Sequence, residues 1–158
     1  MNDVTPAVSL RPFAPDDTDD VLSWFADLDE LRLFAGFAAT WPLTRDDLEA
    51  RALAPGVRSF TMTIADDPVA GHVDLVDEGG HVFRLARIAI APSLRGRRLA
   101  VPLVEAAIVE ARALGARSLS MHVVPGNEPA FRAYSRVGFR AGEPNPEQPG
   151  YVRMTLDL

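Results

Sequence analysis

The stretch from residue 85 to residue 100, LARIAIAPSLRGRRLA, constrains the fold of this chain more than any other. Its first half, residues 85–91, is apolar apart from Arg87 and predicts a buried strand, which Pro92 ends because proline cannot donate to a sheet ladder. A basic loop follows, and from Leu99 onward the apolar spacing is helical. The first N–H groups of a helix lack partners within it and carry partial positive charge. A strand that leads through a basic loop into a helix therefore predicts a binding site for an anion.

The charges of this stretch also favour an anionic ligand. The whole chain has a net charge of −6, yet no acidic residue occurs from position 83 to position 103. The same segment contains five arginines, Arg84, Arg87, Arg95, Arg97 and Arg98. A local basic cluster on an acidic protein favours a discrete anion over a nucleic-acid surface. The alternative interpretation is a strand–helix turn that is merely solvated by arginines.

Length and composition set the class of protein. A chain of 158 residues predicts one domain, residues 1–158, that is large enough for its own core. The absence of cysteine excludes disulfides and thiolate nucleophiles and fits a reducing cytoplasm. The first ten residues lack the regions of a signal peptide, and no apolar run has membrane-spanning length. We therefore expect a cytoplasmic protein whose partners include neither nucleic acid nor membrane.

The order of elements predicts a mixed α/β fold. Strands are expected at 8–11, 59–65, 69–76, 82–91, 117–124 and 151–158, and helices at about 16–28, 44–55, 98–114 and 127–138. The second to fourth strands follow one another as an antiparallel meander. The fourth strand, the long helix and the fifth strand form a βαβ crossover, so these two strands should be parallel. We expect a central mixed sheet with helices on both faces, and an extended loop over the proline-rich residues 141–150.

Two segments leave alternatives open. The aspartates at positions 16, 17, 19 and 20 could form a metal site, but an N-cap and an acidic first helical turn explain them better. Residues 31–41 are rich in aromatic side chains, and the sequence fits either a flap over a cleft or a segment packed on the core.

Residues 127–139, NEPAFRAYSRVGF, predict a short amphipathic helix. Asn127 is suited to cap its start, Glu128 and Pro129 suit its first turn, and Gly138 is suited to end it. Tyr134 lies on the apolar face of this helix. A half-buried tyrosine with a purely structural role would account for these facts alone.

Taken together, the two segments resemble a known family. The pattern Asn127-x-x-Ala130-x-x-x-Tyr134-x-x-x-Gly138-Phe139 is similar to a segment of the GCN5-related N-acetyltransferases. In that family the segment follows an R/Q-x-x-G-x-G/A loop, and residues 95–100 are similar to that loop, with Arg98 in the usual glycine position. Residues 10–13 and 41–44 resemble the branch that contains the ribosomal-protein N-terminal acetyltransferases.

The resemblance implies a cosubstrate site for acetyl-CoA. Backbone N–H groups of the loop would hold the pyrophosphate, the strand would pair with the pantetheine arm and offer an N–H to the thioester oxygen, and Asn127 would contact the pantetheine or the helix start. The implied binding residues are Ile88, Ala89, Ile90, Arg95, Gly96, Arg97, Arg98, Leu99, Ala100 and Asn127. Tyr134 would donate a proton to the departing thiolate as general acid. An amine would attack the thioester directly, and no metal is required.

The resemblance leaves the base and the acceptor open. Candidates for the general base are Asp74, Glu78, His72, His81 and His122, and the histidines lack the spacing of metal ligands. The acceptor could be a small-molecule amine or a protein N-terminus, with a slight preference for cationic amines on an acidic protein. The alternative to an N-acetyltransferase is a catalytically silent acyl-CoA-binding or regulatory domain on the same fold. The oligomeric state, a homodimer included, is open.

Overall fold

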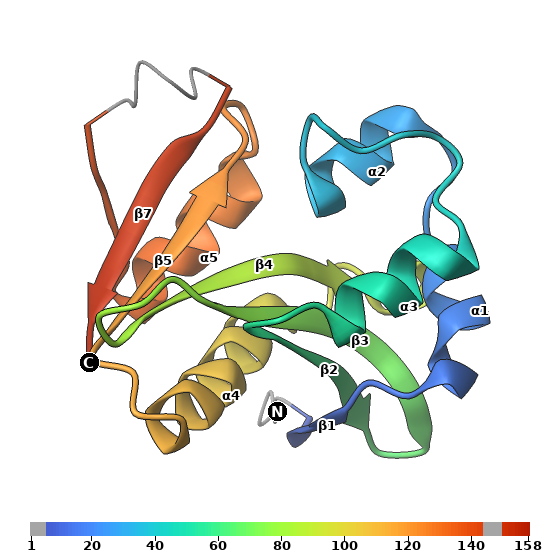
Figure 1. Ribbon diagram of the computed structural model, residues 1–158, viewed down its shortest axis with the longest axis horizontal. Helices are drawn as coiled ribbons and strands as arrows, with labels where there is room; N and C mark the ends of the chain where they lie inside the picture. The colour runs from blue at the N-terminus through green and yellow to red at the C-terminus, as the bar shows by residue number, and fades with distance from the viewer. Residues whose placement is uncertain (1–5, 144–149) are drawn as a thin grey trace, which may run out of the picture.

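A computed structural model describes residues 6–143 and 150–158. Within these residues, the chain forms one seven-stranded sheet with strand order β1-β2-β3-β4-β5-β7-β6 (Figure 1). The strands are β1 (Val8–Pro12), β2 (Val57–Ile64), β3 (Asp67–Asp77), β4 (Val82–Ile90), β5 (Ser118–Val123), β6 (Arg140–Ala141) and β7 (Val152–Asp157). The α-helices are α1 (Thr18–Leu22), α2 (Leu28–Ala35), α3 (Arg45–Leu53), α4 (Ala100–Ala113) and α5 (Glu128–Val137), and the 3-10 turns are η1 (Pro15–Asp17) and η2 (Pro92–Leu94).

The predicted mixed sheet is confirmed. Strands β1 to β4 form an antiparallel meander, and β4 pairs with β5 in parallel, as a right-handed βαβ crossover requires. Strand β7 then pairs antiparallel with β5. The short strand β6 was not predicted, because two residues carry no periodic signal.

Helices cover both faces of the sheet. Alternate residues of β2 and β3 point to opposite faces, and Thr61 and Asp74 carry the contacts to the α1 and α3 side. On the other face α4 packs against β1, β3 and β4, and α5 packs beside α4 (Figure 1). The buried stripe of α4 consists of Leu103, Val104, Ala107, Ile108 and Ala111. Among the described residues, no helix is long and apolar enough to cross a bilayer.

The helix predicted over residues 16–28 is confirmed only in part, because α1 covers Thr18–Leu22. Asp17 is the residue before its first turn. Its carboxylate accepts two 2.7 Å bonds from Arg11, one from the N–H of Ala14 and one from the hydroxyl of Thr61. Burial alone would raise the pKa of Asp17, but these hydrogen bonds outweigh it and hold the pKa below its ordinary value. The anchored side chain belongs to a 3-10 turn, and α1 starts directly after it, at Thr18, and ends at Leu22.

Helix α2 was not predicted, whereas the boundaries of the other predicted elements hold with local shifts. Thr44 and Asp47 form the predicted capping box at the start of α3. Pro102 is the third residue of α4, where its missing N–H has no partner to lose, so the helix keeps its first turn. Most of the extended loop predicted over residues 141–150 lies outside the described residues.

Strand β4 contains a β-bulge opposite β3, close to where β4 separates from β5. His72 pairs with Ala89 while Asp74 pairs with Ala86, so three steps along β4 oppose two along β3. Arg87 lies in this bulge with a φ of 50°, and bulges of this kind bend a strand. The pairing of β4 with β5 ends at Leu85 and Met121. Beyond these residues the two strands separate, and the space between them is available to a ligand.

Candidate active site

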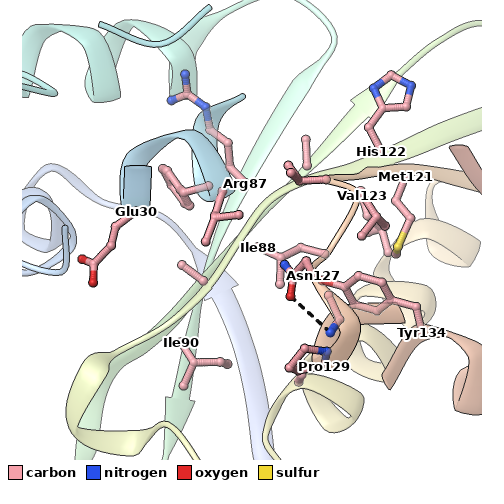
Figure 2. Close-up of a pocket in the computed structure, with 18 of the residues that line it drawn as sticks. Glu30, Arg87, Ile88, Ile90, Met121, His122, Val123, Asn127, Pro129 and Tyr134 are labelled. Carbon is pink, nitrogen blue, oxygen red and sulfur yellow. Dashed lines mark hydrogen bonds between the residues drawn. The ribbon is translucent and has the colours of Figure 1, made fainter. Parts of the chain in front are cut away.

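The central cavity lies where β4 and β5 separate. It has a volume of about 440 Å3 and is lined by residues 85–90 of β4, residues 121–124 of β5 and its end, and Asn127, Ala130 and Tyr134 at α5. Figure 2 shows Tyr134 and Pro129 on one side of β4, with Ile88 between them and Arg87. The structure thus brings Ile88, Ala89, Ile90, Arg95, Ala100, Asn127 and Tyr134 of the predicted site to one cavity.

A second cavity, the loop cavity, lies against the basic loop between α4 and α5. It has a volume of about 470 Å3, and its lining contains Gly96, Leu99 and four arginines, Arg95, Arg98, Arg132 and Arg136. The loop cavity shares Ile90, Arg95, Ala100 and Pro129 with the central cavity, so the two form one groove. Arg97, which was also predicted, lines neither of them.

Arg132 and Arg136 were missed by the sequence analysis. They lie four residues apart on α5 and so share one face of the helix. Their spacing was visible in the sequence, but nothing in it showed that this face would meet the basic loop after β4. That proximity results from the packing of α5 against α4.

The backbone of the basic loop has left-handed residues at two positions. Gly96 has a φ of 82° and Arg98 a φ of 57°. At Arg98 the chain therefore keeps a conformation that favours glycine, although a side chain is present. The resulting turn leads directly into α4, whose first residues, Ala100 and Val101, have no acceptor within the helix for their N–H groups. This is the geometry of the predicted anion site.

Asn127 and Tyr134 have distinct environments on α5. The side-chain oxygen of Asn127 accepts a 3.4 Å hydrogen bond from the N–H of Ala130, drawn as the dashed line in Figure 2. Of the two contacts expected for Asn127, the structure therefore contains the one to the helix start. Burial raises the pKa of Tyr134 to about 12, so its hydroxyl is protonated at neutral pH.

A third cavity, the arginine cavity, continues from the central cavity past the bulge. It has a volume of about 580 Å3 and is lined by Arg32, Arg51, Arg84, Arg87 and His122, together with Phe37 and Tyr151. The two cavities share Leu33, Phe34, Arg87 and His122 among others. In Figure 2, Arg87 and His122 point toward the top of the view, away from Tyr134 and Pro129.

The aromatic segment 31–41 combines both of its predicted roles. Leu31 and Phe34 are buried in the core on α2, whereas Leu33 and Phe37 are exposed and line the arginine cavity. The N–H of Phe37 donates a 2.7 Å hydrogen bond to the hydroxyl of Tyr151, which ties the end of α2 to the start of β7. The segment is therefore packed on the core by one face and covers a cavity with the other.

The structure separates the five candidate bases. His72 and Asp74 are fully buried and hydrogen-bonded to each other at 3.0 Å. Glu78 forms ion pairs with Arg84 and Arg153. His81 is exposed at the turn before β4. His122 alone among these five lines the central and arginine cavities. Burial and the neighbouring charges of Arg84 and Arg153 lower the pKa of His122, although Glu78 opposes them. Its imidazole is therefore neutral at neutral pH.

Glu30 also lines the central cavity and was not among the candidates. One of its carboxylate oxygens accepts a 2.8 Å hydrogen bond from the N–H of Ala26, so it is engaged in holding the turn before α2. Sequence analysis missed Glu30, because the helix that carries it, α2, was not predicted.

Two of the three cavities present groups that suit a ligand with a phosphate end and an apolar arm. The loop cavity offers arginines and a helix start to phosphates, and the central cavity offers an apolar passage beside an open strand edge. Beyond Leu85, the edge of β4 that faces β5 has no strand partner among the described residues.

Comparison with known proteins gives the same family. A sequence model described as "Acetyltransferase (GNAT) family" matches residues 18–139. The chain is 29% identical over 136 residues to a mycothiol acetyltransferase of Brachybacterium faecium, matching 82% of this chain and 40% of that protein. It is 24% identical over 143 residues to an aminoalkylphosphonate N-acetyltransferase of Salmonella typhimurium, matching 87% and 88%. It spans less than half the length of the mycothiol acetyltransferases that it matches.

Solved structures show the same fold. The spermidine N-acetyltransferase of Vibrio cholerae in complex with CoA and spermine superposes with a TM-score of 0.80 and 19% identity, covering 96% of this chain and 95% of that one. At this identity the likeness concerns the fold. The family match covers most of the chain, including the bulged strand, the basic loop and the helix that carries Tyr134. The chain therefore belongs to the acetyltransferase (GNAT) family, whose acyl donor is acetyl-CoA.

Proposed function

We propose that this protein transfers an acetyl group from acetyl-CoA to a primary amine. The observation that carries the proposal is the continuous groove from the loop cavity, past Tyr134, to the arginine cavity. The two ends of the groove have different surroundings. The loop cavity lies at the start of α4, and the arginine cavity is covered by α2 and Tyr151. One end would hold the donor and the other the acceptor.

The donor would be held at the basic loop. Arg95, Arg132 and Arg136, with the backbone N–H groups of residues 95–100, would bind its phosphates. The open edge of β4 at Ile88 to Ile90 would hydrogen-bond the pantetheine amides and give an N–H to the carbonyl oxygen of the thioester. When bound, acetyl-CoA supplies a thioester whose carbonyl carbon accepts the amine and whose carbon–sulfur bond breaks.

Tyr134 would act as the general acid. Its pKa of about 12 keeps the hydroxyl protonated, so the proton is available to the departing sulfur. The apolar surroundings that raise the pKa of the phenol also raise that of a thiol placed beside it, which keeps proton transfer from the phenol feasible.

His122 would accept the proton that the attacking amine loses. It lines both the central and the arginine cavity, and its lowered pKa leaves the imidazole neutral and able to accept a proton. The bond changes then balance, because one carbon–nitrogen bond forms, one carbon–sulfur bond breaks, His122 gains a proton and Tyr134 gives one.

The acceptor end is compatible with a small molecule. The two relatives named above are, by their names, a mycothiol acetyltransferase and an aminoalkylphosphonate N-acetyltransferase, and the fold neighbour is a spermidine N-acetyltransferase. A protein N-terminus as acceptor, membership of the ribosomal-protein branch, a cytoplasmic location and a homodimer stay predictions of the sequence.

The test is release of free thiol from acetyl-CoA in the presence of a panel of primary amines, with wild type and Tyr134→Phe. We expect amine-dependent release by wild type and a loss of about tenfold or more in kcat for the variant. Calorimetric affinity for CoA should be unchanged in the variant. Equal kcat would remove Tyr134 from the mechanism, and CoA binding without turnover of any amine would favour the catalytically silent acyl-CoA-binding domain.

A further inference from the structure

The arginine cavity has an unusual balance of charge for an acidic protein. Four arginines, Arg32, Arg51, Arg84 and Arg87, contribute to its lining, and no aspartate or glutamate does so among the described residues. Net charge does not explain this, since the whole chain carries −6. The positive charge is gathered at the end of the groove where the acceptor would bind.

Two of the four arginines are already neutralised. Arg51 donates from Nε to Asp74 at 3.0 Å, and Arg84 donates from Nε to Glu78 at 2.9 Å. These pairs hold the two side chains in place and reduce their attraction for a further anion.

Arg87 and Arg32 have no such carboxylate. Among the described residues, neither forms an ion pair, and the buried Nη1 of Arg87 and Nε of Arg32 have no hydrogen-bond partner. The Arg87 guanidinium carbon lies 5.7 Å from the centre of the Phe34 ring, which fixes its position without satisfying its N–H groups. Buried donors without acceptors are costly, and a ligand that supplies oxygen acceptors removes this cost.

The more distant charged groups around Arg87 do not cancel its positive charge. The carboxylates of Asp74 and Asp47 attract the Arg87 guanidinium, and the charge of Arg51 repels it. Asp74 also binds Arg51, Ser59 and His72. Asp47 belongs to the capping box of α3 and is bonded to Thr44. Neither carboxylate lines the cavity.

We propose that the acceptor is a primary amine that also carries an acid group, a carboxylate, phosphonate or phosphate, and that Arg87 and Arg32 bind this group in the arginine cavity. The inference rests on the proposed acetyl transfer and names the substrate class of the same site. A guanidinium donates two parallel N–H groups to such an acid, which gives orientation as well as affinity. The amine would then lie toward His122, at the boundary with the central cavity.

The same arginines disfavour cationic acceptors. A polyamine would bring additional positive charge next to Arg87, and like charges in a partly buried site repel strongly. For an acidic amine, the arginines also lower the pKa of its ammonium group and so increase the fraction of neutral amine that can attack. The slight preference for cationic acceptors that we expected from net charge is therefore reversed in this proposal.

The test compares amines that share a two-carbon spacing and differ in the charge of the second group. The series is 2-aminoethylphosphonate, β-alanine, taurine, ethanolamine and ethylenediamine, each assayed for thiol release from acetyl-CoA and titrated calorimetrically into the CoA-saturated protein. We expect kcat/KM and affinity to be at least about tenfold higher for the best acid than for ethanolamine, and lowest for ethylenediamine.

Variants assign the effect to the two arginines. Arg87→Met and Arg32→Met should each reduce the ratio of kcat/KM for the acid to that for ethanolamine by about tenfold, mainly through KM. Arg112→Met, which removes an exposed arginine in the last turn of α4, should keep the wild-type ratio. Because Arg87 is half-buried, thermal melting confirms folding, and Arg32→Met carries the test if Arg87→Met is unfolded.

Three outcomes would overturn the inference while leaving acetyl transfer intact. The first is a higher kcat/KM for ethylenediamine than for every acid, and the second is an equal kcat/KM for all amines of the series. The third is an unchanged ratio of kcat/KM for the acid to that for ethanolamine in both arginine variants. A protein that neither binds acetyl-CoA nor releases thiol would instead contradict the proposed function itself.

Discussion

His122 lies at the boundary of the central and arginine cavities, and its surroundings decide its charge. Burial lowers its pKa from the ordinary value of 6.5, the charges of Arg84 and Arg153 lower it further, and Glu78 acts in the opposite direction. A histidine in this position is neutral at the pH of most cells and is protonated only in acid. This is the charge state that a group receiving a proton requires.

The pH dependence of turnover tests this role. A base acts only when deprotonated, so protonation of His122 should add an acid limb on which kcat/KM falls as the pH drops through its pKa, besides the dependence that the ammonium group of the acceptor contributes. Because that pKa is lowered, we expect the fall below pH 6.5. His122→Gln should abolish this limb of the profile and reduce kcat/KM at higher pH by about tenfold or more.

His81→Gln is the matched control for this experiment. His81 is exposed at the turn before β4, lines neither the central nor the arginine cavity, and should leave the profile unchanged. An unaltered acid limb in His122→Gln would assign the proton transfer to another group.

At the residue scale, the sequence predicted what depends on near neighbours. The capping role of Asn127 and the position of Tyr134 on α5 follow from spacing within one short segment. Arg132 and Arg136 line the loop cavity, and His122 lines the arginine cavity, only because helices and strands meet in the folded chain. Spacing could not reveal them.

Among the elements, β4 and its neighbour β3 determine the shape of the site. Gly71 of β3 pairs with Ile90 at the end of β4 that leads into the basic loop. A Cβ added at Gly71 would lie 2.9 Å from the carbonyl oxygen of Ala89 and 2.9 Å from the Cε of Met62. Both distances are too short, so the close approach of β3 to β4 requires a residue without a side chain.

Gly71→Ala should therefore lower the free energy of unfolding by about 1–3 kcal/mol, because β4 must move or Met62 must repack. Urea denaturation followed by tryptophan fluorescence measures the change. Gly142→Ala is the control, since its added Cβ would meet only the carbonyl oxygen of Arg153 at 3.5 Å. Equal unfolding midpoints for both variants and wild type would show that β3 and β4 tolerate the side chain.

Element prediction succeeded where the apolar period was regular and failed where one residue changed the path of the chain. The meander, the crossover and α4 were predicted from their patterns, and the sheet confirms them. Of the helix predicted over residues 16–28, only Thr18–Leu22 is α-helical, and it follows a 3-10 turn in which Asp17 is anchored by Arg11 and Thr61. The bulge at Arg87 was not predicted, since a one-residue change of register leaves no mark on composition.

For the whole molecule, the three cavities form a path through the fold from α4 to α2. The basic loop follows the end of β4, and the arginine cavity lies past the bulge of the same strand. The path thus has arginines at both ends and an apolar middle, on a chain whose net charge is −6. In the proposed function, this distribution would separate the phosphate-binding end from the acceptor-binding end.

The central claim is that the basic loop binds acetyl-CoA, and two glycines allow a matched test. Gly96 in the loop and Gly79 in the turn before β4 have φ values of 82° and 83°, and no atom of the described residues lies within 4 Å of a Cβ added at either position. Glutamate at either position introduces the same strain and the same charge, but only Gly96→Glu places it against the four arginines of the loop cavity.

The measurement is calorimetric titration of wild type, Gly96→Glu and Gly79→Glu with acetyl-CoA. The account predicts a Kd on the order of micromolar for wild type and for Gly79→Glu, and affinity weakened about tenfold or more in Gly96→Glu. Absence of binding by wild type, or an equal loss in both variants, would contradict it.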